Sequence, residues 1–204
     1  MKVTHHGKVA LLQLNPPTSL VYLGHELMQA IADELLVLEK DKNVNVVILT
    51  GKGQSFATGA NIKEIQETTF HNKLWDKSDM GWFKIISTFR MPLIAAINGI
   101  AFKGGLELAM MCDIVVASED SKMGLPETKL GVMPSTGGTV RLRQSIGKSS
   151  ASKIILSGAV IPAADALKYG LVSRIYPKDD LIRNTIGMGQ KIAENPLTAS
   201  VFAK

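Results

Sequence analysis

The sequence is short of cysteine, with Cys112 alone among 204 residues. A disulfide within the chain is therefore excluded, and a metal site built from cysteines is not expected. No histidine lies near Cys112 in the sequence to favour a thiolate, so we interpret this residue as a small buried hydrophobic side chain. The four histidines have none of the spacings typical of metal ligands, and the sequence predicts no metal site.

Long apolar runs are also missing from the chain. The longest, VALLQL and LIAAI, are too short to cross a bilayer. The N-terminal MKVTHHG lacks the continuous apolar core of a secretory signal. These two absences predict a soluble protein of the cytoplasm or the mitochondrial matrix that does not bind membranes.

Aromatic residues are scarce too, at 5% of the chain, and the positive charge is scattered. Lysine and arginine number 23 against 18 for aspartate and glutamate, and the resulting net charge of +5 favours an anionic ligand. A nucleic-acid groove would concentrate cations and place stacking aromatic rings between them. Arg141 and Arg143 are the nearest approach to a cationic cluster, so nucleic-acid binding is not expected.

The remaining composition is typical of a folded α/β protein. Hydrophobic residues make up 46% and charged residues 20%, and 18 glycines are spread through the chain. A chain of this length buries a sizeable core without disulfides or a structural metal. Neither an internal repeat nor a linker divides it, so we expect a single domain over residues 1–204.

Hydrophobic patterns predict alternating strands and helices. Residues 9–14 and 44–49 are short apolar runs, and between them apolar residues recur on one helical face over residues 24–40. A strand, a helix and a strand in succession predict parallel pairing of the two strands. Further strands are predicted over residues 92–97, 113–118 and 171–176, and further helices over residues 66–89, from residue 104, and over residues 139–146, 151–158, 162–170 and 179–193.

Three short motifs contain residues suited to chemistry. In GGLE, residues 104–107, a glycine pair stands at a predicted helix start, where free amides and the helix dipole favour an anionic oxygen. Glu107 ends that motif, and Glu127 ends the similar loop motif GLPE. The loop ATGANI, residues 57–62, can supply a second amide donor. Taken singly, these motifs are explained by a helix start, a solvated glutamate and a turn.

The order of the motifs gives them a common meaning. The runs FATGANIKE, INGIAFKGGLELAMMCDIVVAS, GLPETKLGVMPSTGGTVRLRQSIG, and ILSG with GLVSRIYP follow one another along the chain. From about Val9 to Pro196, the sequence resembles the enoyl-CoA hydratase/isomerase family, also called the crotonase family. The resemblance implies an α/β fold in which a spiral of ββα units forms a sheet core surrounded by helices. It implies acyl thioesters of coenzyme A as substrates, with no cofactor besides the coenzyme A within the substrate.

The same resemblance assigns roles to four residues. The backbone amides of Ala60 and Gly104 correspond to the oxyanion hole for the thioester oxygen. Glu107 corresponds to the carboxylate that orients and deprotonates water for attack at Cβ, and Glu127 to the group that supplies a proton at Cα. Fixed amides stabilise the enolate that develops, and two carboxyl groups serve as base and acid when their protonation states differ. The resemblance thus implies a 2-enoyl-CoA hydratase.

Substrate contacts are implied along the loop around residue 60 and at the second glycine of GGLE. Lys63 either meets a phosphate of coenzyme A or is an ordinary solvated helix lysine. The full set implied for substrate binding is Ala57, Gly59, Asn61, Ile62, Lys63 and Gly105.

The sequence departs from the family pattern at several positions. Asn61 stands where the family often has aspartate, and Met123 replaces a more typical aromatic residue. Lys103 occupies a position that is usually small; its side chain either crowds or contacts the ligand, or it points away as a surface residue. The chain ends at NPLTASVFAK, where family members usually continue into C-terminal helices that cover the acyl site and build trimers or hexamers. We expect that extension to be absent here, and a homotrimer or hexamer where it is present.

Two alternative functions remain open at this point. Double-bond isomerisation proceeds with one carboxylate and without added water, and the presence of both glutamates favours hydration over it. A non-catalytic RNA-binding member of the family is suggested by the pI near 9.3 and by Lys103. The scattered charge and the two intact carboxylates count against that alternative.

Overall fold

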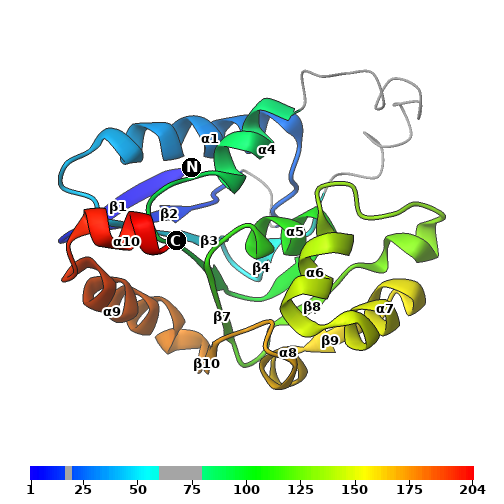
Figure 1. Cartoon of the computed structure of the whole chain (residues 1–204). Helices are drawn as coiled ribbons and strands as arrows, with labels where there is room; N and C mark the ends of the chain where they lie inside the picture. The colour runs from blue at the N-terminus through cyan, green and yellow to red at the C-terminus, as the bar shows by residue number, and fades with distance from the viewer. Residues whose placement is uncertain (17–19, 60–79) are drawn as a thin grey trace.

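The protein consists of two β-sheets with helices around them (Figure 1). The computed structural model describes residues 1–16, 20–59 and 80–204. Of the helix predicted over residues 66–89, only the part from Met80 lies within the described residues, where it forms α4 (Met80–Ser87).

The larger sheet has six strands in the order β1-β2-β3-β5-β7-β10. Its strands are β1 (Lys2–His6), β2 (Val9–Gln13), β3 (Val46–Thr50), β5 (Leu93–Ile97), β7 (Ile114–Ser118) and β10 (Arg174–Tyr176). β2 and β3 pair in parallel, which confirms the pairing predicted from the strand, helix and strand pattern. β1 pairs antiparallel with β2; it is missing from the predicted elements because KVTHH contains a single apolar residue.

The smaller sheet has four strands in the order β4-β6-β8-β9. Its strands are β4 (Ser55–Ala57), β6 (Ile100–Phe102), β8 (Lys122–Gly124) and β9 (Val160–Pro162). β4, β6 and β8 run parallel, and β9 runs antiparallel to β8. Each strand has only three residues, too few for an alternating pattern to be recognised in the sequence.

The strands follow one another in pairs that divide between the sheets. β3, β5 and β7 belong to the larger sheet, and the strand after each of them, β4, β6 and β8, belongs to the smaller one. Within the described residues, α5 (Gly104–Met110) follows β6, and η2 (Pro126–Leu130) and α6 (Gly138–Ile146) follow β8. This repetition is the spiral of ββα units that the sequence resemblance implies.

The helix predictions agree with the structure at most ends. The predicted ends at Gly158 and Gly170 are confirmed, since both glycines close helices in the left-handed conformation. The helix predicted as the last ends at Ala193, but α10 follows it, which corrects that prediction. The remaining helices are α1 (His25–Lys40), α7 (Lys148–Ser157), α8 (Ala163–Tyr169), η3 (Lys178–Asp180), α9 (Leu181–Ala193) and α10 (Leu197–Ala203).

The two faces of the larger sheet bury alternate residues of each strand. Val47 and Leu49 of β3 belong to the main core, together with buried residues of α1, α4 and α5. Val46 and Ile48 point the other way, into a smaller cluster that α9 covers. Figure 1 shows α1 and α4 on one side of this sheet and α9 on the other. The resulting core fixes β6 and β8, the strands that precede the two glutamates.

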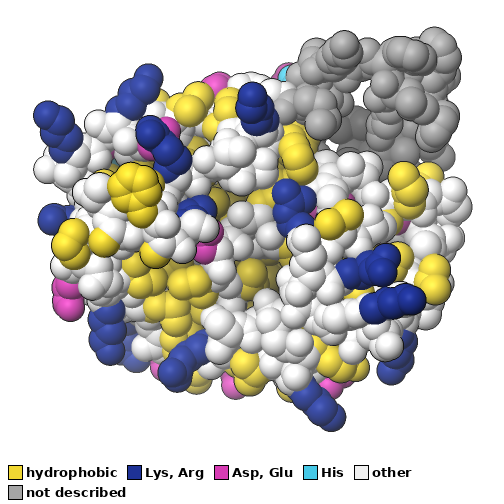
Figure 2. Space-filling view, in the orientation of Figure 1, with side chains coloured by type: hydrophobic (Ala, Val, Ile, Leu, Met, Phe, Trp, Pro, Cys, Tyr) yellow, Lys and Arg dark blue, Asp and Glu magenta, His cyan; other side chains and the backbone are white. Residues whose placement is uncertain are grey.

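The surface carries its positive charge in a scattered form. Figure 2 shows lysine and arginine side chains distributed over the whole of one face, with no continuous patch of positive charge there. None of the described helices combines the length and the apolar character needed to span a bilayer.

Candidate active site

Helix α5 carries Glu107 into the interior of the protein. The helix starts directly after β6, and its residues Leu106, Leu108 and Ala109 are fully buried or nearly so. Glu107 lies within this buried stretch, and only 2% of its surface is exposed. A carboxylate at such a position is costly unless donors surround it, so its partners define the site.

Three hydrogen-bond donors surround the Glu107 carboxylate, and all come from one segment of chain. The amides of Thr136 and Gly138 donate to Oε1, at 2.9 and 2.7 Å. The hydroxyl of Thr136 donates to Oε2, at 2.5 Å. Gly138 is also the first residue of α6, so the carboxylate lies at the positive end of that helix dipole. These contacts supply the donors that a buried carboxylate needs.

Gly138 is glycine because Glu107 approaches it so closely. A Cβ atom at this position would lie 2.8 Å from Oε1 of Glu107. In the sequence, Thr136 and Gly138 lie in a segment rich in glycine and proline, just before the helix predicted from residue 139. The consecutive glycines of STGGT were the available signal for a close backbone contact, and the sequence offered no indication that Glu107 would be the group in contact.

Glu127 lies on η2, just beyond β8, with 6% of its surface exposed. Its Oε2 atom is buried and has no hydrogen-bond partner among the described residues. Burial, with a smaller contribution from the negative charge of Glu107, raises the pKa of Glu127 to about 7; a backbone hydrogen bond and the charge of Lys103 act in the opposite direction. Between the ordinary pKa of a glutamate and a pH of about 7, Glu127 therefore keeps the proton that an exposed glutamate would lose.

The topology of the smaller sheet brings the two glutamates together. β6 and β8 are neighbouring parallel strands, with Phe102 opposite Gly124, so their carboxyl ends meet at the same edge. Glu107 follows the end of β6 by five residues, and Glu127 follows the end of β8 by three. One carboxyl group has three donors and the other has a free buried oxygen, and this asymmetry suits a base and an acid acting on one ligand.

The two glycines of GGLE are glycine for different structural reasons. A Cβ atom on Gly105 would lie 2.0 Å from the carbonyl oxygen of Ala57, so Gly105 lets α5 pack against β4. Among the described residues, the nearest atom to a Cβ on Gly104 would be the Cα of Gly59, at 3.7 Å. Packing within the described residues therefore explains why residue 105 is glycine, whereas it leaves space beside Gly104 for a ligand.

The amide of Gly104 is available as a donor. Gly104 is the first residue of α5, where a helix has no internal acceptor for the N–H group, and no described residue accepts a hydrogen bond from it. The residue is also partly exposed. This amide can therefore bind a carbonyl oxygen of a ligand.

The loop after β4 lies against the start of α5. Gly59 has a φ of +82°, and a Cβ atom there would lie 2.7 Å from the Cβ of Lys103 and 3.0 Å from the amide nitrogen of Gly104. The Gly59 carbonyl accepts a hydrogen bond from the amide of Leu23, at 3.0 Å, which helps to hold the loop in place. Ala57 is fully buried in β4. The other residues predicted in this loop, Ala60, Asn61, Ile62 and Lys63, lie outside the described residues.

Lys103 is held in a backbone conformation that is costly for a lysine. Its φ of 53° and ψ of −130° make it the sole non-glycine residue with positive φ within the described parts of the chain. Such a conformation costs about 1–3 kcal/mol. The side chain is partly buried, and its charge acts on Glu127. The departure from the family pattern at Lys103 therefore affects Glu127.

The remaining candidates lie outside this site. Cys112 is buried with its Sγ near the carbonyl oxygen of Leu108, and burial raises the pKa of its thiol far above the usual range. Within residues 1–16, 20–59 and 80–204, no three histidine, cysteine, aspartate or glutamate side chains are grouped as metal ligands.

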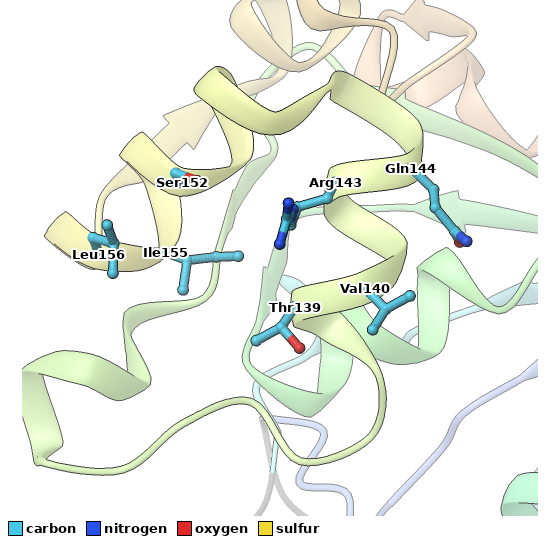
Figure 3. Close-up of a pocket in the computed structure, with 7 residues that line it drawn as sticks. All are labelled: Thr139, Val140, Arg143, Gln144, Ser152, Ile155 and Leu156. Atoms are coloured by element: carbon cyan, nitrogen blue, oxygen red, sulfur yellow. The ribbon is translucent and has the colours of Figure 1, made fainter.

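A surface pocket of about 420 Å³ lies between α6 and α7, and neither glutamate lines it. Figure 3 shows the Arg143 side chain lying in the gap between the two helices. None of the residues predicted for the site lines this pocket. Its lining residues are Thr139, Val140, Arg143, Gln144, Ser152, Ile155 and Leu156.

Comparison with known proteins identifies relatives of the whole chain. Residues 4–204 match the family model for enoyl-CoA hydratase/isomerase. A probable enoyl-CoA hydratase of Rhizobium meliloti (strain 1021) is 41% identical over 202 residues, covering 99% of this chain and 78% of the relative. The 2,3-dehydroadipyl-CoA hydratase of Escherichia coli (strain K12) is 40% identical, covering 99% of this chain and 79% of that enzyme.

The fold of the chain matches that of a solved enoyl-CoA hydratase structure. An enoyl-CoA hydratase from Bacillus anthracis superimposes with a TM-score of 0.92 at 34% sequence identity. The match covers 99% of this chain and 80% of that one. The sheets and helices described above therefore form the fold of this group of enzymes.

Proposed function

Because the chain belongs to the enoyl-CoA hydratase/isomerase family, we propose that it adds water across the 2,3 double bond of a 2-enoyl-CoA thioester. The observation that carries this proposal is the pair of buried carboxyl groups in unlike environments. Among the described residues, Glu107 has three donors, whereas Glu127 has an oxygen without a partner and a pKa raised to about 7 by burial. Hydration needs one group that accepts a proton and one that gives a proton, and this pair supplies both.

In the proposed reaction, the thioester oxygen accepts hydrogen bonds from the amides of Gly104 and Ala60. The carboxylate of Glu107 takes a proton from water as the water oxygen forms a bond to Cβ. The electrons of the double bond move to Cα and the carbonyl, giving an enolate whose oxygen the two amides stabilise. The protonated carboxyl of Glu127 then gives its proton to Cα. The product is a 3-hydroxyacyl-CoA, and proton transfer from Glu107 to Glu127 restores the starting state.

Substrate contacts in this proposal follow the loop around residue 60. We propose that the backbone from Ala57 to Ala60, with Asn61, Ile62 and Gly105, borders the thioester and the adjoining part of coenzyme A. Lys63 is proposed to meet a phosphate of the nucleotide end, a role that the net positive charge of the chain favours.

Hydration is favoured over isomerisation by Glu127. Moving a double bond along the acyl chain can proceed with one carboxylate that takes and returns the same proton, so a second carboxyl group is not required. Here the second group is buried at the same site with one oxygen free of any partner among the described residues. A buried carboxyl oxygen without a partner costs stability, and a role in handling water would account for its presence.

The direct test uses the purified protein with a short 2-enoyl-CoA. We expect the absorbance of the conjugated thioester to fall and the product mass to increase by one water. In the hydration direction, kcat should decrease as the pH rises through about 7, because Glu127 then loses the proton that it gives to Cα. A product of unchanged mass would indicate isomerisation. No turnover of any enoyl-CoA, together with salt-sensitive RNA binding, would favour the non-catalytic alternative.

Removal of the Lys103 charge should move this alkaline limit. The cation lowers the pKa of Glu127, so Lys103→Met should raise that pKa and shift the alkaline limb of the kcat profile to higher pH. Methionine keeps a long side chain on the same strained backbone, so the charge alone is changed. The matched control is Lys8→Met, at an exposed turn between β1 and β2, which should leave the profile where it is. A Lys103→Met profile that coincides with the control would contradict an effect of Lys103 on Glu127.

A further inference from the structure

We propose that Thr136 is a positioning residue that fixes the plane of the Glu107 carboxylate for attack by water, an inference that rests on the proposed function. Thr136 provides two of the three donors to this carboxylate, one from its amide and one from its hydroxyl. The hydroxyl is the sole donor to Oε2 among the described residues. Thr136 itself does not touch the reacting atoms in this proposal, so its effect passes through Glu107.

The geometry explains why both oxygens need a partner. The amides of Thr136 and Gly138 both donate to Oε1, so the restraint that they supply acts at one end of the rigid carboxylate. The hydroxyl contact at 2.5 Å adds a restraint at Oε2, and with both oxygens held the group resists rotation about the terminal bond of the side chain more strongly. A general base is effective only when its lone pair points at the proton it takes, so fixing this plane is expected to affect the chemical step.

Arg141 holds residues 136–138, which supply the donors to Glu107, in place. The Nη1 of Arg141 donates to the Thr136 carbonyl oxygen at 2.9 Å, and the same guanidinium lies 5.2 Å from the ring centre of Phe83. Gly137 has a φ of +95°, and a Cβ atom there would lie 2.0 Å from that Nη1 atom. The turn at Gly137 therefore lets Arg141 reach back to Thr136, and the hydroxyl is in position before any ligand arrives.

The inference also accounts for the asymmetry of the two carboxyl groups. Glu107 receives its donors from residues 136–138, whereas Oε2 of Glu127 receives none from the described residues. Of the three donors to Glu107, the two amides cannot be removed by exchanging a side chain. The hydroxyl can be removed in this way, so substitution of Thr136 tests how this hydrogen bond affects Glu107.

Thr136→Val removes the hydroxyl and keeps the β-branched shape, and Thr136→Ser keeps the hydroxyl. We expect the valine variant to lower kcat for hydration about tenfold, the size of effect expected for losing one hydrogen bond to a charged group. KM should stay within about twofold, because the acyl-CoA does not contact this side chain. The serine variant should restore kcat.

Thr88→Ala, at an exposed position at the end of α4, is the control for a lost threonine hydroxyl and should behave as the wild type. A valine variant with wild-type kcat would overturn the inference. A serine variant as impaired as the valine variant would also overturn it, because shape rather than the hydroxyl would then matter. Failure of the proposed function is a separate result, recognised by a wild-type protein that hydrates no enoyl-CoA.

Discussion

Glu107→Gln is expected to lower kcat for enoyl-CoA hydration by about 10²–10⁴-fold, the range that general-base catalysis contributes. An amide cannot take the proton of the attacking water. The substitution should nevertheless preserve the fold, because the glutamine oxygen can accept from the amides of Thr136 and Gly138 as Oε1 does now. The glutamine nitrogen can donate to the Thr136 hydroxyl, which is able to reverse its role from donor to acceptor.

Steady-state kinetics and thermal unfolding of the same samples check this prediction. Glu127→Gln is the companion variant: it mimics the protonated carboxyl in shape but has no acidic proton for Cα, so a comparable loss is expected. Glu119→Gln, on the exposed surface after β7, is the matched control and should keep the wild-type kcat. Full activity in the Glu107 and Glu127 variants would remove both residues from the mechanism.

The sequence could predict the elements that form a clear apolar pattern. β2 and β3 are short continuous apolar runs bounded by turn residues, α1 has apolar residues on one helical face, and the parallel pairing of the two strands follows from this order. The strands of the smaller sheet have three residues each, so their pairing depends on contacts between distant parts of the chain. β9, for example, is placed by antiparallel pairing with β8.

The candidate site was also only partly predictable from the sequence. Glu107 and Glu127 could be named from their motifs, but their proximity depends on the pairing of β6 with β8, two strands that the sequence did not reveal. The donors at Thr136 and Gly138 lie about thirty residues beyond Glu107 in sequence, and only the folded chain brings them to the carboxylate. Local patterns identify reactive groups, whereas long-range pairing determines which of them meet.

Gly105→Ala and Gly104→Ala should have different effects, although the residues are neighbours: the first should lower stability and the second should lower activity. Gly105→Ala places a methyl group 2.0 Å from the carbonyl oxygen and 2.6 Å from the carbonyl carbon of Ala57. Both are backbone atoms of β4, fully buried, so neither can move without disturbing the sheet. We expect a loss of more than about 4 kcal/mol in the free energy of unfolding, or no folded protein. Thermal or denaturant unfolding measures it.

Gly104→Ala should fold normally, because among the described residues its methyl group would find ordinary contacts, at 3.7 Å to Gly59 and 3.9 Å to Oε2 of Glu107. The methyl group would occupy space between those two groups, where the proposed thioester oxygen approaches the Gly104 amide. Displacing that oxygen from its donor should lower kcat/KM by about 10²-fold or more. Wild-type activity in Gly104→Ala would place the thioester elsewhere than the start of α5. A normal unfolding midpoint in Gly105→Ala would contradict the packing that separates the two glycines.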